Sequence, residues 1–478
     1  MNLDKMIVGE DLSKYKDNIK KIFFYRICGT GMGACACLAK EAGYDISGAD
    51  MTYSPPMSTY LESLEIPLFS LNDLTHVQLQ EFDLIVVGNS VPRNSEYAKF
   101  VEESGVPFTS FPSFLGEFIL KDKEVIGLAG THGKTTSTYF IAQMLESLGE
   151  DTGYFVGGII NDRPPSRYGK SKYFVIESDE YDSAYFQKIS KFRLYELNHM
   201  ILTSLEFDHA DIFNNIESIK DEFRAILPEF TGEILANDDY PAILELIQEY
   251  RSNTWTLYGE KSDIGPTDIQ VQNGKSSFIV ELEDENVSFE TNIVGVHNIL
   301  NISSCIILLN KLGFCSEDLK IAVKELGMVK RRQEERGKYK GALVVDDFAH
   351  HPKAITLTLD AIKAKYPGKR VITVFEPISA TARSSHFQNE FMISLQKSDQ
   401  VILAQNPLQT TVQSSSNLDC DLIVEELKKN DVPAYNAKNL EDLVSKIDSS
   451  VNDTSLLLIL SNRTCLGLWE SDFVTELS

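Results

Sequence analysis

A glycine-rich segment with one lysine and several hydroxyl side chains is the part of the sequence best equipped for chemistry. The segment reads Gly130, Thr131, His132, Gly133, Lys134, Thr135 and Thr136. Backbone N–H groups of such a turn converge on an anion, the lysine reaches the terminal phosphates of a nucleotide, and the Thr135 hydroxyl can ligate Mg²⁺. The spacing typical of GTPases and kinases would require a glycine at Leu128. The segment therefore predicts a phosphate-binding loop of another, shorter class.

Two acidic segments could meet the metal ion that such a loop uses. The first contains Glu177, Asp179, Glu180 and Asp182, and the second contains Asp208, His209 and Asp211. Mg²⁺ prefers one or two carboxylates together with phosphate oxygens and water. Each segment follows an apolar run, so parallel strands would bring both to the edge of the sheet that carries the phosphate loop. The first segment is thus placed to meet Mg²⁺, and His209 could ligate a second ion or contact the transferred phosphate. A solvated acidic turn and a structural histidine are the alternatives.

Two further polar segments favour contacts with a nucleotide or a substrate. Carboxylates and imidazoles cluster in the first, at Asp346, Asp347, His350 and His351. Neighbouring histidines rarely form a tetrahedral zinc site without further ligands at regular spacing, so a contact loop at the start of a helix is favoured over zinc. The second segment contains His297, Asn298 and Asn301. Amide side chains suit the edge of adenine, with helix capping as the alternative.

A second glycine-rich turn lies near the start of the chain. Its residues are Gly29, Thr30, Gly31, Met32 and Gly33, and a predicted helix runs from there to about Ala42. An acidic residue, Asp50, stands about 20 positions further on, as in the nucleotide-binding fingerprint of a Rossmann-like unit. This geometry can bind any pyrophosphate, including that of a dinucleotide or of a nucleotide sugar.

The elements around these segments predict an α/β chain with parallel sheets in three domains. We place the domains at 1–122, 123–328 and 329–478. The expected strands are 22–25, 84–87, 108–109, 125–129, 173–176, 199–203, 342–345, 371–375, 401–403 and 455–460. Residues 267–294 alternate like antiparallel strands, and 299–312 are predicted to be helical. A polar hinge is expected after the basic cluster Lys330, Arg331 and Arg332.

Composition and charge limit the partners and the location. There are 70 acidic and 45 basic residues, and the net charge of −25 disfavours binding to nucleic acid or to anionic membranes. The sequence has no apolar stretch of about 18 residues and no signal-peptide pattern, so we expect a cytoplasmic protein. We separately expect a monomer or weak dimer. The seven cysteines lack a metal-binding spacing and are predicted to be small buried thiols.

Taken together, these segments resemble the Mur ligases, the ATP-dependent amide ligases of peptidoglycan biosynthesis. The matching segments are collinear over nearly the whole chain, at 130–136, 177–182, 207–211, 297–301, 332 and 347–352. Within the family, segments 54–59, 205–213 and 346–352 most resemble the recycling enzymes that join the tripeptide L-alanyl-γ-D-glutamyl-meso-diaminopimelate to UDP-N-acetylmuramate. UDP-N-acetylmuramate:L-alanine ligase, which shares the donor, is the alternative.

The resemblance implies a three-domain architecture with a division of labour. The Rossmann-like N-terminal domain would bind the UDP-sugar, the central P-loop domain would bind ATP and Mg²⁺, and the C-terminal Rossmann-like domain would bind the peptide and close over the other two. ATP would convert the lactyl carboxylate of the donor into an acyl phosphate, which the amine of the peptide then attacks. Phosphoryl transfer of this kind depends mainly on positioning and charge neutralisation.

The resemblance also implies roles for individual residues. Lys134 would neutralise the β- and γ-phosphates, Thr135 and Glu177 would hold one Mg²⁺, and His209 would hold or orient a second. The remaining implied catalytic and ATP-binding residues are Asp347, His351, Arg332, His297 and Asn298, with the last two reading adenine. In the first domain, the turn from Gly29 to Gly33 would hold the UDP diphosphate, with Asp50 and Asn89 near the uridine or the sugar.

The sequence departs from the family pattern at several positions. Many Mur ligases carry a carbamylated lysine where this chain has Phe223-Arg224, and Arg26 replaces the usual small residue before the first glycine-rich turn. The peptide ligases' Glu-Pro-Arg-Ser-Asn-Thr and Ser-Asn-Gly-Gly stretches here read Glu-Pro-Ile-Ser-Ala-Thr, at 376–381, and Ser-Asn-Arg-Thr, at 461–464. Arg383 and Arg463 remain as candidate peptide-binding residues, so we expect an anionic peptide whose third residue can differ from diaminopimelate.

Two other classes of function compete with the ligase. The altered stretches of the third domain would also suit a nucleotide-dependent binding or regulatory protein that keeps the fold without ligation. The first glycine-rich turn by itself would suit an NAD-dependent oxidoreductase, but that class leaves the phosphate loop at 130–136 unexplained.

Overall fold

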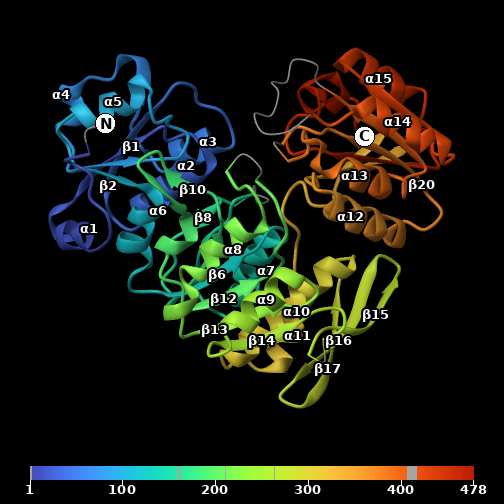
Figure 1. The fold of residues 1–478 in the computed structure, drawn as a ribbon, viewed down its shortest axis with the longest axis horizontal. Helices are drawn as coiled ribbons and strands as arrows, with labels where there is room; N and C mark the ends of the chain where they lie inside the picture. Colours follow the sequence, from blue (N-terminus) through green and yellow to red (C-terminus); the bar gives the residue numbers. More distant parts are fainter. Residues whose placement is uncertain are drawn as a thin grey trace. The chain divides into compact units, whose positions relative to one another are not determined.

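The structure is a computed structural model that describes residues 3–158, 160, 163–209, 212–262, 264–379, 381–405 and 417–478. Ala210 and Asp211 of the second acidic segment, and Ala380 of the stretch at 376–381, lie outside the described residues. The chain forms two compact units, coloured along the sequence in Figure 1. The first unit comprises Met1–Glu206, Ile216–Gly265 and Ser304–Ala322, and the second comprises Phe207–Asn215, Pro266–Ser303 and Val323–Ser478. Both contain parallel sheets, so the predicted α/β class is confirmed.

The first unit begins with a five-stranded parallel sheet in the order β3-β2-β1-β4-β5. Its strands are β1 (Lys21–Tyr25), β2 (Asp45–Asp50), β3 (Leu68–Ser70), β4 (Leu84–Val87) and β5 (Phe108–Ser110). Its helices are α1 (Gly9–Tyr15), α2 (Thr30–Glu41), α3 (Met57–Ser63), α4 (His76–Leu79), α5 (Glu96–Glu103) and α6 (Phe111–Phe114). The strand order changes direction between β1 and β4, and the loops after these strands therefore flank the switch point where doubly wound sheets bind nucleotides.

Alternating apolar residues explain how this sheet packs. Phe23 and Tyr25 of β1 join one buried cluster with Ala98 and Val101 of α5. On the opposite side of the strand, Phe24 packs edge-on against Phe114 of α6. Both faces of the sheet are thereby covered, as expected for a parallel sheet.

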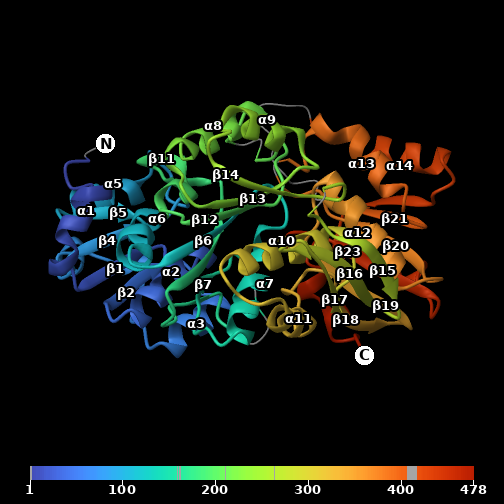
Figure 2. The same cartoon turned by 90° about the horizontal axis from the view of Figure 1, so that it is seen from below.

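The first unit also contains a seven-stranded sheet in the order β14-β13-β12-β6-β9-β7-β8, parallel except for β8. Its strands are β6 (Glu124–Ala129), β7 (Gly153–Phe155), β8 (Ser166–Arg167), β9 (Tyr173–Ser178), β12 (His199–Leu202), β13 (Glu233–Asn237) and β14 (Thr254–Tyr258), and a hairpin is formed by β10 (Asp182–Ala184) and β11 (Gln187–Ser190). Figure 2 shows α8 (Ile216–Arg224) and α9 (Pro241–Glu249) on one face and α7 (Lys134–Ser147) on the other. Because β9 and β12 flank β6, the segments that follow these three strands meet at one edge.

The second unit contains an antiparallel sheet and a mostly parallel one. The antiparallel sheet consists of β15 (Thr267–Gln272), β16 (Lys275–Leu282) and β17 (Glu285–Thr291), as predicted for 267–294. The larger sheet has the order β18-β19-β23-β20-β21-β22. Its strands are β18 (Glu334–Tyr339), β19 (Ala342–Asp347), β20 (Arg370–Phe375), β21 (Gln400–Ala404), β22 (Ala434–Ala437) and β23 (Ser455–Leu460). Two helices, α10 (Val296–Lys311) and α11 (Ser316–Lys324), have residues in both units.

Helices cover both faces of the larger sheet. Buried residues of α12 (Pro352–Lys365), α13 (Gln388–Leu395) and α14 (Cys420–Lys429) form one cluster with the strands. Residues of α15 (Leu440–Asp448) and of the C-terminal turns form the cluster on the opposite face. The carboxyl ends of β19, β23 and β20 therefore lie side by side at an edge that the helices leave for loops.

The structure differs from the sequence-based expectations in the hinge and in the burial of two cysteines. The predicted polar hinge after Arg332 contains β18, an antiparallel edge strand that pairs with β19. The polar sequence of β18 gave no strand pattern, because an edge strand tolerates charged residues and is stabilised by pairing rather than by burial. Cys315 is exposed and Cys28 half-buried, whereas the other five cysteines are buried as expected, and all seven are free thiols. Among the described residues, no helix is long and apolar enough to cross a membrane.

Candidate functional site

The loop between β6 and α7 has the backbone of a phosphate-binding turn. Gly130 and Gly133 adopt φ values of +121° and +85°, in the left-handed region that favours glycine. A Cβ atom on Gly130 would lie 2.4 Å from the carbonyl oxygen of Ser204, so the close approach of the two segments also requires glycine. Helix α7 begins at Lys134, and the loop therefore presents a helix N-terminus of the kind that binds anions.

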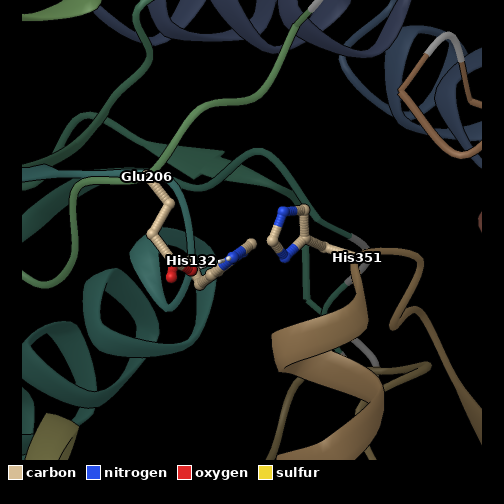
Figure 3. A group of neighbouring side chains, drawn as sticks. All are labelled: His132, Glu206 and His351. Carbon is tan, nitrogen blue, oxygen red and sulfur yellow. Dashed lines mark ion pairs between the residues drawn. The ribbon is translucent and has the colours of Figure 1, made fainter. Parts of the chain in front are cut away.

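The residues after β12 hold this loop in place. The backbone N–H of His132 donates to Ser204 Oγ at 2.7 Å, and the hydroxyls of Thr203 and Ser204 both donate to the His132 carbonyl oxygen. Thr131 Oγ1 donates to the Glu206 carbonyl oxygen at 3.1 Å and accepts from the Glu206 N–H at 2.9 Å. His132 Nε2 also lies 3.2 Å from Glu206 Oε2 (Figure 3). These hydrogen bonds fix the loop before any ligand arrives.

Lys134 is buried and bound to a carboxylate. Its ammonium group donates to Glu180 Oε2 at 3.0 Å and to the Gly130 carbonyl oxygen at 2.6 Å. Burial by itself would lower the pKa of Lys134, but the carboxylates of Glu180, Asp179 and Glu177 outweigh it and raise the pKa. The lysine is therefore charged, and Glu180 is the carboxylate paired with it in this structure.

Thr135 and Glu177, the two predicted metal ligands of the central sheet, contact each other. Thr135 Oγ1 donates to Glu177 Oε1 at 2.9 Å, and Glu177 Oε2 accepts from the Gly157 N–H at 2.7 Å. Burial and the neighbouring Asp179 raise the pKa of Glu177, against the opposing effects of Lys134 and the two hydrogen bonds. A buried carboxylate beside a hydroxyl and near a phosphate loop is the oxygen donor set that Mg²⁺ prefers, so these residues fit that ion.

His209, the third predicted metal ligand, lies in the segment that belongs to the second unit. Its φ is +54°, and its carbonyl oxygen accepts the N–H groups of Ile212 and Phe213. Asp208 Oδ1 accepts both the His209 N–H at 2.7 Å and the Thr381 hydroxyl at 2.6 Å. The left-handed turn at His209 is thus held by the loop after β20, and its role as a metal ligand stays a prediction.

The carboxyl end of β19 positions Asp347 and His351. Asp347 is buried and accepts the N–H groups of Gln333 and Ala349, both at 2.8 Å. Burial raises the pKa of Asp347, while the Arg332 guanidinium and these hydrogen bonds oppose the shift. His351 is buried at the start of α12 (Figure 3), where its ring packs on Phe387 with the centroids 4.8 Å apart.

Arginine side chains lie around the same loop. The guanidinium carbons of Arg331 and Arg332 lie 5.7 and 4.9 Å from the centroid of the Phe348 ring. Arg331 also pairs with the fully buried Asp346 at 3.1 Å and donates to the carbonyl oxygen of Arg463 at 2.8 Å. Arg331 therefore braces two loops of the sheet edge, whereas the predicted contact of Arg332 with a nucleotide stays a prediction.

The two stretches that depart from the family pattern are joined by one buried carboxylate. Glu376 Oε2 accepts the Ser461 hydroxyl at 2.6 Å and the Cys465 N–H at 3.1 Å, and Oε1 accepts the Leu466 N–H at 2.9 Å. Arg463 is exposed on the turn that Glu376 holds, and Arg383 lies in the turn after the other stretch. The structure thus brings both altered stretches together at one sheet edge.

The predicted adenine-reading residues lie at the start of α10. Asn298 is buried, and its side-chain amide donates to the Val294 carbonyl oxygen at 2.9 Å. His297 is half-buried beside it. Helix capping and contact of either residue with adenine both stay predictions.

The first glycine-rich turn leads into α2. Gly29 is the N-cap of this helix, with Thr30 exposed and Gly31 half-buried, and Met32 is buried. A Cβ atom on Gly33 would lie 2.2 Å from the Met57 sulfur, so this glycine allows α2 to pack against α3. Asn89 is exposed in the turn after β4. Asp50 accepts the Cys28 N–H at 2.8 Å and pairs with Arg26 at 3.3 Å, and its carboxylate thus braces the turn.

Several residues at these sites were not singled out from the sequence as site residues. Thr203, Ser204 and Glu206 hold the phosphate loop, and Thr381 holds the segment of His209. The available signal was the pair of hydroxyl residues, Thr203 and Ser204, directly after β12, which pairs with the strand before the phosphate loop. Strand pairing is a property of the sheet, so that signal becomes useful only when the strand order is known.

Three family models cover most of the chain. "Mur ligase family, catalytic domain" matches residues 21–123, "Mur ligase middle domain" matches 128–309, and "Mur ligase, glutamate ligase domain" matches 331–463.

Similar proteins share most of their length with this chain. A UDP-N-acetylmuramate–L-alanyl-gamma-D-glutamyl-meso-2,6-diaminoheptandioate ligase of Haemophilus influenzae is 33% identical, with 94% of this chain and 98% of the relative covered. The Escherichia coli protein of the same name is 36% identical, over 80% of this chain and 85% of its own. A crystal structure of a murein peptide ligase from Psychrobacter arcticus aligns with a TM-score of 0.68 at 27% identity, covering 96% of this chain and 98% of that one.

Proposed function

Because the chain belongs to the Mur ligase family, we propose that it uses ATP to join UDP-N-acetylmuramate to a free murein peptide, as in peptidoglycan recycling. Members of the family are ATP-dependent ligases that form amide bonds, and this chain is such an enzyme. The peptide is L-alanyl-γ-D-glutamyl-meso-diaminopimelate or a similar anionic tripeptide. The similarity to two ligases with this acceptor in their names, over most of the chain, carries the proposal.

The proposed reaction begins at the phosphate loop. A carboxylate is a poor electrophile, so the γ-phosphoryl group of ATP is first transferred to the lactyl carboxylate of the donor, giving an acyl phosphate and ADP. Lys134 would exchange Glu180 for the β- and γ-phosphates and neutralise the charge that develops on them. Thr135 and Glu177 would hold Mg²⁺, which supplies further charge neutralisation, with His209 at a second ion.

The peptide then completes the reaction. Its free amine attacks the carbonyl carbon of the acyl phosphate and forms a tetrahedral intermediate. The bond between this carbon and the phosphate oxygen then breaks, so that phosphate is released and the amide is formed. Exclusion of water protects the acyl phosphate from hydrolysis. Arg332 and Asp347 would bring the third domain onto the nucleotide, with His351 as a further catalytic residue, and His297 and Asn298 would contact adenine. The proposed domains are 1–122 for the donor, 123–328 for ATP and 329–478 for the peptide.

The acceptor is chosen at the edge where β20 and β23 end. Glu376 holds the turn that carries Arg463, so this guanidinium is displayed on a fixed backbone. Together with Arg383 it would pair with carboxylates of the peptide. The altered residues of these stretches support an anionic tripeptide whose third residue can differ from diaminopimelate.

A coupled assay of ADP release tests the proposal. Purified protein is supplied with ATP, Mg²⁺ and UDP-N-acetylmuramate, and with the tripeptide, a tetrapeptide or L-alanine in separate reactions. We expect ADP and phosphate release only when a peptide is present, with a product whose mass equals donor plus peptide minus water. Turnover with L-alanine alone would assign the chain to the alanine-adding class instead. Binding of ATP and donor without any product would identify a non-catalytic binding protein.

A further inference from the structure

Arg26 occupies an unusual position at the end of β1. It replaces a small residue at the turn, and its φ of +67° lies in the left-handed region that favours glycine. Such backbone conformations persist in non-glycine residues only where the surroundings fix them, and they cluster at functional sites. The backbone is fixed here because the Arg26 N–H donates to the Ala49 carbonyl oxygen at 2.9 Å.

The side chain of Arg26 is held by groups from two other elements. Its Nε lies 3.3 Å from Asp50 Oδ1 at the end of β2, and its guanidinium carbon lies 5.6 Å from the ring centroid of Tyr97 in α5. Asp50 is itself buried and bound to the Cys28 N–H, so it offers a rigid partner. These contacts orient the guanidinium plane before a ligand binds, which lowers the entropic cost of binding.

The place of this guanidinium suggests its ligand. It lies at the end of β1, beside the switch point between β1 and β4 and directly before the turn that leads into α2. The turn at 28–33 contains no lysine or arginine, and the protein as a whole carries a net charge of −25. An anionic group bound there needs a local cation, because the field of the whole protein opposes it. Guanidinium groups match phosphate oxygens with two parallel hydrogen bonds.

We propose that Arg26, oriented by Asp50 and Tyr97, binds the diphosphate of a nucleoside diphosphate ligand. Nε pairs with Asp50, and the two terminal nitrogens would bridge phosphate oxygens. The assignment gives Asp50 a positioning role, through Arg26 and Cys28, in place of direct contact with the ribose. It rests on the proposed function for the identity of the donor, but its chemistry requires only a nucleoside diphosphate.

Calorimetric titrations with UDP, UMP and uridine test this assignment. For Arg26→Gln we expect about tenfold or greater weakening for UDP, a smaller change for UMP and none for uridine. The matched variant Arg251→Gln removes an exposed arginine from the segment before β14, in the other sheet, and it measures the general effect of one lost charge. Equal losses for UDP and uridine, or equal losses in the two variants, would overturn the assignment.

A second variant separates binding from folding. Arg26→Gly removes the guanidinium and also suits the left-handed backbone, so this variant should be at least as stable to thermal unfolding as the wild type. Its affinity for UDP should nevertheless be lower than that of the wild type. Normal UDP binding by a well-folded Arg26→Gly protein would also refute the role of Arg26. If the wild type bound ATP but no UDP, the proposed donor would be wrong. If Arg26→Gln ligated normally and bound UDP with unchanged affinity, only the role of Arg26 would be refuted.

Discussion

Lys134 and Glu180 form a buried ion pair in the phosphate loop, with 3.0 Å between Nζ and Oε2. Glu180 is 2% exposed, so neither charge is screened by water to the extent of a surface pair. The pair keeps the lysine charged while the loop lacks a ligand. We expect a bound phosphate group to compete with this carboxylate for the ammonium group, which would link the stability of the loop to ligand binding.

Replacing Glu180 by glutamine should expose this link. The buried ammonium group would lose its charged partner, so we expect the free protein to lose about 3 kcal/mol of stability, and ATP to stabilise the variant more than it stabilises the wild type. Thermal unfolding with and without ATP and Mg²⁺ measures both effects. The same substitution at the exposed Glu103 is the control and should change neither. Equal stabilisation of both proteins by ATP would contradict the exchange.

Removing the lysine itself tests its role in phosphoryl transfer. Lys134→Ala should lower turnover by two orders of magnitude or more, because loss of one charged contact to developing phosphate charge costs about 3 kcal/mol. The control is Lys99→Ala, which removes an exposed lysine from α5. Steady-state rates of ADP release give the comparison, and near-normal rates in Lys134→Ala would remove this residue from the mechanism.

The raised pKa of Glu177 predicts how Mg²⁺ binding depends on pH. The proton and the metal compete for the same carboxylate, so Mg²⁺ binding weakens as the pH falls through the raised pKa of Glu177. This loss begins at a higher pH than it would for a glutamate with the ordinary pKa. Without metal the sign for stability is opposite. The folded protein holds this proton more tightly than the unfolded chain does, so the contribution is fully present below the unfolded pKa and is lost as pH rises through the folded pKa.

Thermal shifts produced by Mg²⁺ over a pH series measure this competition. We expect the shift to grow as the pH rises, and to be small and independent of pH in Glu177→Gln. A wild-type shift that stayed constant from acidic to neutral pH would place the metal away from Glu177.

The hydroxyl of Ser204 should support ATP binding because it holds the phosphate loop. Ser204→Ala removes its hydrogen bonds to the N–H and the carbonyl oxygen of His132, and we expect about tenfold weaker ATP binding. Ser204→Thr keeps the hydroxyl and should restore most of the affinity. Affinity for UDP, measured on the same samples, should stay unchanged because that site lies in the other sheet. Unaltered ATP binding in Ser204→Ala would show that the loop is held without this residue.

The acceptor site is tested by Arg463. Arg463→Ala leaves the backbone carbonyl that Arg331 binds and removes only the exposed guanidinium, so the turn should keep its structure. We expect the KM for an anionic tripeptide to rise about tenfold while the KM for ATP and the donor stay the same. A KM for the tripeptide equal to that of the wild type would show that the acceptor is recognised elsewhere.

The sequence by itself determined the local features of this protein. Glycines in Gly130-Thr131-His132-Gly133-Lys134 and apolar runs such as 125–129 specify a strand, a left-handed turn and a helix, because backbone freedom and side-chain periodicity act over a few residues. The collinear motifs identified the family, which the comparisons confirm. Periodicity also found strands such as β6, β12 and β19, but it missed others, among them β13, β14 and β22, and also β18, whose stability comes from pairing with β19.

Only the tertiary structure decided which side chains meet. Strand order placed Ser204 beside His132 and Glu376 beside Ser461, although 72 and 85 positions separate these pairs in the sequence. It also engaged Glu180 with Lys134 and Asp50 with Arg26, two partners that no spacing rule suggests. Hydrogen bonds and buried charges act over about 3 Å, and such distances between remote residues are fixed only when the sheets pack.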